Sequence, residues 1–193
     1  MPDAAAYTAT NVSTGKPNVT GSVYRAPLGT ALPTDATTAL NSAFKHLGYV
    51  SEDGLVNANG PETDSIKAWG GDTVLGLQSE KQDTWKLTLI EVLNKYVQEA
   101  VYTSDNVSGD LDTGITIKAN SKEMEEACWV FDMLMRGDVL KRVVLPDAKI
   151  SELGDIVYKD DEAIGYEITL LATPDATKNT HYEYIKKAGS SSS

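Results

Sequence analysis

Short segments in which apolar and polar residues alternate recur along this chain and constrain its fold most strongly. In residues 84–89, for example, Trp85, Leu87 and Leu89 alternate with polar residues. Because successive side chains of a strand point to opposite faces, this pattern predicts strands with one buried face. Further strands are expected at residues 22–25, 65–69, 74–79, 111–118, 139–145, 156–158, 164–172 and 181–186.

Residues 126–136 form the most apolar segment and differ from the others because both of their faces are apolar. Ala127, Trp129 and Phe131 share one face, whereas Cys128 and Val130 share the other. An antiparallel strand with one solvated face would alternate cleanly, so this strand needs cover on both sides. A helix or a neighbouring subunit could supply that cover. A tight turn at 136–138 leads into the strand at 139–145, which Pro146 is expected to end.

Two helices are predicted. In residues 92–102, apolar residues recur about every four positions, which is typical of an amphipathic helix. A second, shorter helix is expected between Pro33 and Gly48, with Thr34 or Asp35 as its N-cap and Gly48 at its C-terminal end.

A series of antiparallel hairpins with few helices indicates a mainly β (α+β) fold. We expect an antiparallel β-sandwich or barrel with one flanking α-helix and a short second helix. The length of 193 residues fits one domain. Residues 1–20 are predicted to be a flexible N-terminal arm, residues 21–187 the β-sandwich domain, and residues 188–193 a flexible Ser-rich tail.

The charge of the chain argues against nucleic-acid binding, and its hydropathy gives no indication of membrane insertion. There are 28 Asp and Glu residues against 17 Lys and Arg, which gives a formal net charge of −11. Proteins that bind nucleic acid neutralise phosphates with Lys and Arg. No apolar run approaches the roughly 20 residues of a membrane span, and the first residues lack the pattern of a signal peptide. We therefore expect a protein that is made in the cytoplasm.

No combination of residues predicts catalysis, a cofactor or a metal site. His46 and His181 are isolated from other ligand types, the acidic groups Asp155 and 160–162 lack the spacing of a calcium loop, and Gly70-Gly71-Asp72 lacks the lysine of a phosphate loop. We interpret these as surface or packing histidines, a solvated hairpin tip and a turn. The lone Cys128 is expected to be buried.

Two further groups of residues, a pair of glutamates and the three tryptophans, are candidate sites. Glu125 and Glu126 are adjacent in a predicted strand and would point to opposite faces, so they are not expected to act on one substrate. Trp85 and Trp129 alternate with aliphatic residues and are expected in the core. Trp69, beside two glycines, is the best candidate for an exposed aromatic residue.

Six ordered segments of the chain resemble the major tail tube proteins of siphophages, particularly those of actinobacteria. They span much of residues 22–185, which makes their combination more specific than any one of them. The segments are APLGTALPT (26–34), LGYVSEDGL (47–55), IKAWGG (66–71), LIE (89–91), VVLPDA (143–148) and DIVYKDDEAIGY (155–166).

The resemblance implies a structural virion protein that is not an enzyme. The members of this family are β-sandwiches with a flanking helix. Six subunits close a ring, and their inner sheets join into one barrel. Rings stack on a tape-measure protein, a terminator caps them, and tail tip or baseplate proteins and tail chaperones are further partners. By analogy, strands from Thr84 and from Glu126 onward are candidates for the inner sheet. The terminal arms and a long loop within residues 50–83 would contact the next ring.

An acidic chain also suits a lumen through which phage DNA slides without specific binding, because like charges repel. The sequence is also compatible with two alternatives. One is a head–tail connector or tail terminator that forms a single ring. The other is a soluble β-sandwich that binds sugar or protein through Trp69 and tyrosines.

Overall fold

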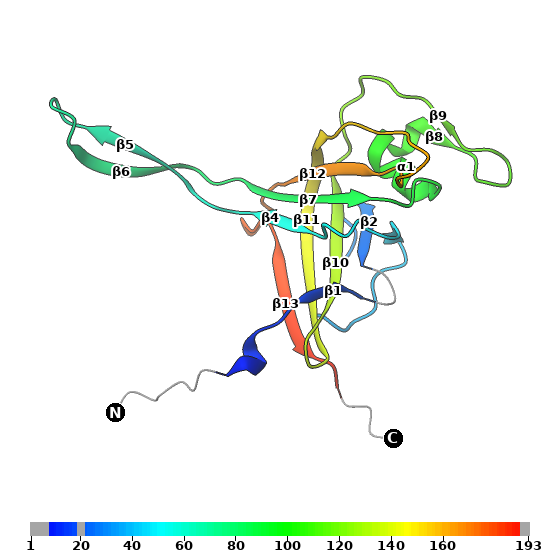
Figure 1. Ribbon diagram of the computed structural model, residues 1–193, viewed down its shortest axis with the longest axis horizontal. Coiled ribbons are helices and arrows are strands. Elements are labelled where there is room, and N and C mark those ends of the chain that lie inside the picture. Colours follow the sequence, from blue (N-terminus) through cyan, green and yellow to red (C-terminus); the bar gives the residue numbers. More distant parts are fainter. Residues whose placement is uncertain (1–7, 19–21, 190–193) are drawn as a thin grey trace.

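The chain folds around one antiparallel sheet, as a computed structural model shows for residues 8–18 and 22–189 (Figure 1). The strands are β1 (Gly15–Pro17), β2 (Val23–Pro27), β3 (Lys45–His46), β4 (Val56–Ala58), β5 (Glu62–Lys67), β6 (Thr73–Glu80), β7 (Asp83–Leu89), β8 (Val107–Ser108), β9 (Thr116–Ile117), β10 (Ala127–Met135), β11 (Val139–Leu153), β12 (Tyr166–Ala172) and β13 (Tyr182–Lys187). The helices are α1 (Lys95–Tyr102) and the short 3-10 segments η1 (Ala9–Asn11) and η2 (Ser104–Asn106).

The long strand β11 connects the two parts of the main sheet. Nine strands belong to this sheet within the described residues, in the order β3-β2-β10-β11-β12-β7-β4, with β1 added to β10 and β13 added to β11. The first part of β11 pairs with β10 and β13, and its last residues pair with β12. Figure 1 shows β7 and β12 crossing the direction of β10, β11 and β13. The sheet therefore bends along β11 and faces itself.

The main core lies inside this bend. Trp85 of β7 stacks on Phe131 of β10 with ring centroids 5.8 Å apart, although two strands separate β7 from β10 in the sheet. Val97 and Val101 of α1 belong to the same buried cluster. The two parts of the sheet thus pack face to face with α1 beside them, which confirms the predicted mainly β fold with one flanking helix.

The second face of β10 is covered by a different part of the chain. Cys128 and Val130 on this face pack with Val144 and Phe44 in a separate buried cluster, and Leu32 and Leu40 lie against it. The cover is therefore residues 28–44 of the same chain, whereas α1 packs on the opposite face. This explains why residues 126–136 are apolar on both faces without requiring a second subunit.

A buried ion pair ties the covering segment to the sheet. Arg142 donates from Nε and Nη2 to the two carboxylate oxygens of Asp132, at 2.7 and 2.8 Å. Its Nη1 donates to the carbonyl oxygens of Asp35 and Thr38, at 3.1 and 2.7 Å. One guanidinium group thus neutralises a buried carboxylate and satisfies two loop carbonyls, as its planar set of donors allows.

The predicted short helix between Pro33 and Gly48 is wrong. These residues form successive turns followed by β3, which pairs with β2. The Asp35 carboxylate accepts hydrogen bonds from the backbone of Thr37 and Thr38, and Asn41 Oδ1 accepts one from Ala43 N at 2.9 Å. Such local side-chain bonds compete with helical ones, so a good N-cap residue closed turns instead of starting a helix. α1 is the one α-helix of the described residues, and it begins at Lys95 after the N-cap Asn94, later than the predicted position 92.

Three strand predictions need correction. β11 does not end at Pro146 but continues to Leu153, because Pro146 and Asp147 lie opposite the single Cys128 in a bulge that needs no donor from proline. Residues 156–158 are not a strand, since β12 pairs with β11 instead. The strand predicted at 111–118 is reduced to β9, which pairs with β8.

The expected terminal arms fall partly outside the described residues. Within residues 8–18, β1 pairs with residues 133–135 at the end of β10. Residues 1–7 and 190–193 lie outside the described residues, as do residues 19–21. The division into arm, domain and tail stays a prediction.

The buried pair predicts a large effect of removing one partner. Replacing Arg142 with Met leaves Asp132 charged and buried and frees the segment 28–44, so the free energy of unfolding should fall by about 3–5 kcal/mol. Urea denaturation measures this change. The matched control is Lys159→Met, which breaks the exposed Lys159–Glu162 ion pair and should leave the midpoint unchanged. Equal effects of the two substitutions would contradict the structural role of Arg142.

Candidate assembly surfaces

The β5–β6 hairpin is the most distinctive surface feature, because it projects from the body as an arm (Figure 1). It leaves the sheet between β4 and β7, and its strands pair only with each other among the described strands. Residues 61–78 are all exposed. The strands predicted at 65–69 and 74–79 are thus confirmed with shifted bounds. A hairpin that buries almost nothing in its own subunit contributes little to the stability of that subunit.

The turn of the arm depends on glycine. Gly70 and Gly71 have φ angles of 120° and 99°, a region that other residues rarely adopt. Backbone bonds from Ala68 N to Asp72 O (2.7 Å) and from Gly71 N to Ala68 O (3.0 Å) close the turn. This confirms the interpretation of Gly70-Gly71-Asp72 as a turn.

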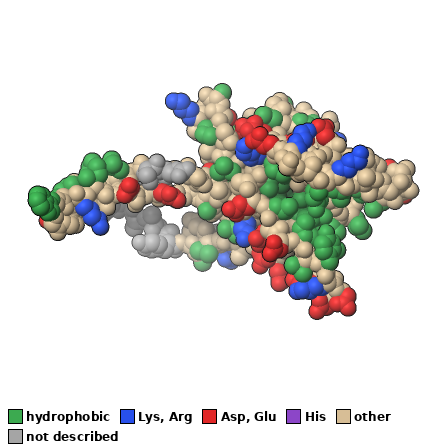
Figure 2. All heavy atoms as spheres, turned by 90° about the horizontal axis from the view of Figure 1, so that it is seen from above, with side chains coloured by type: hydrophobic (Ala, Val, Ile, Leu, Met, Phe, Trp, Pro, Cys, Tyr) green, Lys and Arg blue, Asp and Glu red, His purple; other side chains and the backbone are tan. Residues whose placement is uncertain are grey.

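Apolar side chains are concentrated on this arm. Trp69 is fully exposed at the turn, and Ile66 and its cross-strand partner Leu75 are each about half exposed. Figure 2 shows apolar side chains at the end of the arm and along one of its sides. The exposed Trp69 confirms the prediction made from its neighbours. Exposed apolar groups of this kind on a soluble protein usually mark an interaction site.

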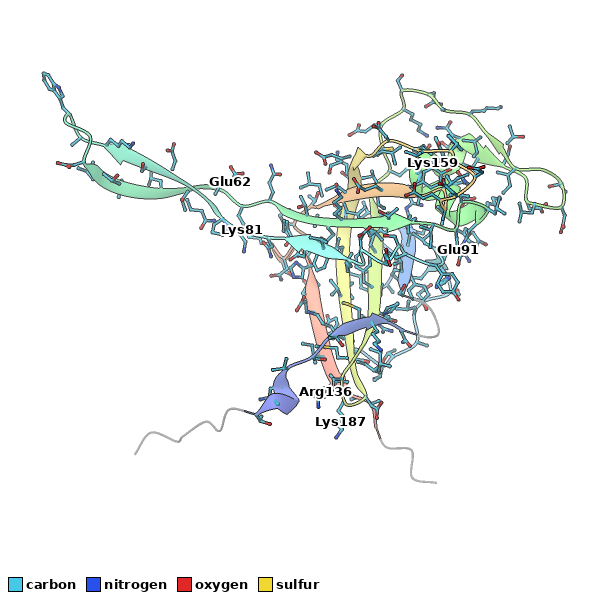
Figure 3. The ribbon with its side chains drawn as sticks, viewed as in Figure 1. Glu62, Lys81, Glu91, Arg136, Lys159 and Lys187 are labelled. Carbon is cyan, nitrogen blue, oxygen red and sulfur yellow. The ribbon has the colours of Figure 1, made fainter. Side chains whose placement is uncertain are left out.

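A buried polar cluster anchors the base of the arm, where Figure 3 labels Glu62 and Lys81. Asp83, the first residue of β7, is buried and accepts hydrogen bonds from Asn57 Nδ2 at 2.8 Å and from Thr180 Oγ1 at 2.6 Å. His181 Nδ1 lies 2.5 Å from the same carboxylate, and its ring packs edge-on against Trp85. The cluster therefore connects the base of the arm to the start of β13. Sequence reasoning missed it because Asp83 and Thr180 are far apart along the chain.

The other candidate residues either pack in the core or form hydrogen bonds within the subunit. Trp85 and Trp129 are buried in the main core, so they form no aromatic platform with Trp69. His46 Nδ1 accepts a hydrogen bond from Gly48 N at 3.1 Å. Cys128 is buried, and burial raises the pKa of its thiol above the ordinary value. The described residues contain no group of three His, Cys, Asp or Glu side chains that could hold a metal ion.

The two adjacent glutamates also differ from the prediction, because they precede β10 and do not lie within it. Glu125 accepts hydrogen bonds from Arg25 Nη2 at 2.8 Å and Ser104 Oγ at 2.7 Å, whereas Glu126 is exposed. Burial raises the pKa of Glu125, but these hydrogen bonds outweigh it and hold the pKa below its ordinary value. Glu125 thus joins β2 to η2.

Acidic residues are concentrated in two loops near α1. Residues 104–126 contain six Asp and Glu against two Lys, and residues 154–165 contain four against one. The opposite end of the long strands carries basic residues, including Arg136 at the β10–β11 turn and Lys187 at the end of β13 (Figure 3). The net negative charge is therefore distributed unevenly over the surface.

The comparison with protein families decides what kind of protein carries this arm. A family model described as phage tail tube protein matches residues 9–192, which is nearly the whole chain. The chain belongs to the phage tail tube protein family. No curated protein matches it significantly.

As a tail tube protein, the chain is a structural component of the virion tail that assembles with copies of itself and with other tail proteins. The match confirms the resemblance inferred from the six ordered segments. It also favours a tube subunit over the sugar-binding alternative. No helix in the described part of the chain is long and apolar enough to cross a membrane.

The Asp83 cluster gives a second stability prediction. Replacing Asp83 with Ala leaves the donors of Asn57 and Thr180 without their acceptor, and the free energy of unfolding should fall by about 1–3 kcal/mol. Asp72→Ala is the control, because the Asp72 side chain at the tip of the arm is exposed and no such bond is lost. Chemical denaturation of both variants measures the difference. A loss no greater than that of Asp72→Ala would show that the cluster does not stabilise the arm's base.

Proposed function

We propose that this tail tube protein forms stacked hexameric rings in the long non-contractile tail of a siphophage, and that the resulting tube conducts DNA into the host. The family match over residues 9–192 carries the tube assignment. The projecting β5–β6 arm supports the stacking, because residues 61–78 are exposed in their own subunit and are therefore available to a neighbouring one. The arm also lies within the segment 50–83 that the resemblance assigned to contacts with the next ring.

The edges of the main sheet support ring closure. Among the described strands, β13 pairs only with β11, and β4 pairs only with β7. An unpaired edge is a template for a strand of another chain, and a closed barrel removes such edges. Sheets of neighbouring subunits that joined at these edges would form the continuous inner wall. β7 is the best candidate for that wall, because one of its faces is partly exposed, whereas β10 is covered on both faces within the subunit.

The proposed role is passive and needs no catalytic group or cofactor. The tape-measure protein would set the tube length, while the terminator, the tail tip or baseplate proteins and the tail chaperones would bind during assembly in the host cytoplasm. The acidic character of the chain would let DNA slide without specific binding. Tubes of the purified protein should accordingly retain no DNA at physiological salt in a filter-binding assay. Retention that weakens steeply with salt would indicate phosphate contacts and contradict this role.

Electron microscopy of the purified protein at high concentration tests the tube directly. Long hollow tubes of uniform width are expected. Isolated rings would favour a head–tail connector or terminator instead. A protein that remained monomeric together with its tape-measure protein would contradict the proposal.

Removing the arm tests its role in stacking. A variant in which residues 62–80 are replaced by a short Gly-Ser turn should keep the thermal stability of the intact chain, since the arm packs on no other strand of the described sheet. It should form no long tubes, because the contact between rings is lost. Shortening the exposed stretch 157–163, which leaves Ile156 in place against the core, serves as a control of similar kind. Full-length tubes of the arm deletion would contradict the proposed stacking role.

A further inference from the structure

An apolar pocket lies in the body of the subunit between β1, β2 and residues 50–55. Its volume is about 280 Å³, and Val23, Leu55, Leu87, Phe131 and Met133 contribute apolar lining. Three of these side chains also belong to the main core, so the pocket is an opening onto well-packed strands. The volume is below that of typical small-molecule sites and is suited to one large side chain.

We propose that the indole of Trp69 inserts into this pocket of a second copy of the chain. This inference rests on the proposed function, because it identifies the place where the arm of one subunit binds the next. Trp69 is fully exposed, whereas the pocket presents apolar surface to solvent. Burying a tryptophan removes about 150–250 Å² from water, and tryptophan is enriched among the residues that dominate interface energies.

The contact must be between molecules. The arm points away from the body that contains the pocket (Figures 1 and 2), so a subunit cannot fill its own pocket. Arm tip and pocket are different surfaces of one chain, and such heterologous contacts generate closed rings or open-ended filaments. Stacked rings of a tube need a contact of this type between one ring and the next.

Charges around the two surfaces are complementary. Lys67 and Asp72 flank Trp69 on the two sides of the turn, and Lys16 and Glu52 lie at the pocket. All four side chains are exposed, and none forms a hydrogen bond or ion pair within the described parts of the chain. Insertion of Trp69 can place Lys67 near Glu52 and Asp72 near Lys16. Two ion pairs at the rim would fix the orientation of the arm more than they would strengthen its binding.

A second pocket beside α1 fits the indole less well. It has about 320 Å³ and is lined by Arg25, Glu125, Lys45 and Tyr96, among others. Arg25 already pairs with Glu125, and Lys45 lies 5.8 Å from the centroid of the Tyr96 ring. Its polar groups are therefore engaged within the subunit, and it serves as the reference site in the tests below.

Tryptophan fluorescence gives the first test. Trp85 and Trp129 are already buried, so assembly should shift the emission to shorter wavelength and reduce iodide quenching through Trp69 alone. Trp69→Phe should abolish that spectral change. Trp69→Ala should fold with unchanged thermal stability and raise the concentration needed for assembly at least about tenfold. Unchanged assembly of Trp69→Ala would overturn the inference while leaving the tube function intact.

Charge reversal tests the rim pairs. Lys67→Glu should weaken assembly, and the double variant Lys67→Glu/Glu52→Lys should restore it, because every subunit of a homopolymer carries both changes. Lys67→Glu with Glu126→Lys at the reference pocket is the control and should not recover. Recovery in the control alone would place the arm at the other pocket and overturn the inference.

Disulfide trapping locates the arm directly. In tubes of the double variant Ala68→Cys/Ser51→Cys, which keeps Trp69, oxidation should link neighbouring subunits into a ladder on a non-reducing gel, whereas Ala68→Cys/Glu99→Cys should give none. Cys128 is buried and should not interfere. If the purified chain does not polymerise, which would count against the proposed function, the same variants are tested in complete tails. A ladder from the Glu99 variant alone, or from neither variant in intact tubes, would overturn the inference.

Discussion

The bend of the sheet along β11 is the constraint on which the rest of the structure depends. β11 pairs with β10 and β13 along its first part and with β12 along its last, and the bulge at Pro146 and Asp147 lies near the change of partner. Bulges bend a strand and increase its twist. The bend brings Trp85 onto Phe131 and creates a closed core from a single sheet. It also directs β7, and therefore the β5–β6 arm, away from the long strands.

The subunit separates surfaces for folding from surfaces for assembly. Both faces of β10 are covered within the subunit, one by α1 and the crossing strands, the other by residues 28–44 held by Arg142. The arm by contrast contributes nothing to these cores, and the cluster around Asp83 together with the pairing of β4 and β7 fixes its base. This separation suits a protein that must first fold as a single chain and then join a polymer, because the arm can bind another subunit without disturbing either core.

The sequence predicted the elements that depend on local pattern and missed those that depend on distant partners. The alternation in residues 84–89 and the apolar run at 126–136 gave strands close to their observed bounds. The pattern at 34–47 predicted a helix, but the side chains of Asp35 and Asn41 close turns instead. Arg142 of the distant strand β11 then donates a hydrogen bond to a carbonyl oxygen of the resulting loop. Likewise, no local signal showed that Asp83 would meet Thr180 and His181.

By itself, the sequence determined a mainly β chain of the tail tube family, an exposed Trp69 beside two glycines, and an acidic surface. These follow from side-chain periodicity, backbone freedom at glycine, composition and the order of short segments, all of which are properties of the chain alone. Only the tertiary structure decided that the β5–β6 hairpin projects as an arm, that residues 28–44 cover β10, and that a pocket opens beside β1. The cover on β10 and the pocket arise where segments far apart in sequence share buried surface, and the burial of that surface, not local preference, sets their positions. The direction of the arm follows from the path of β7 in the bent sheet.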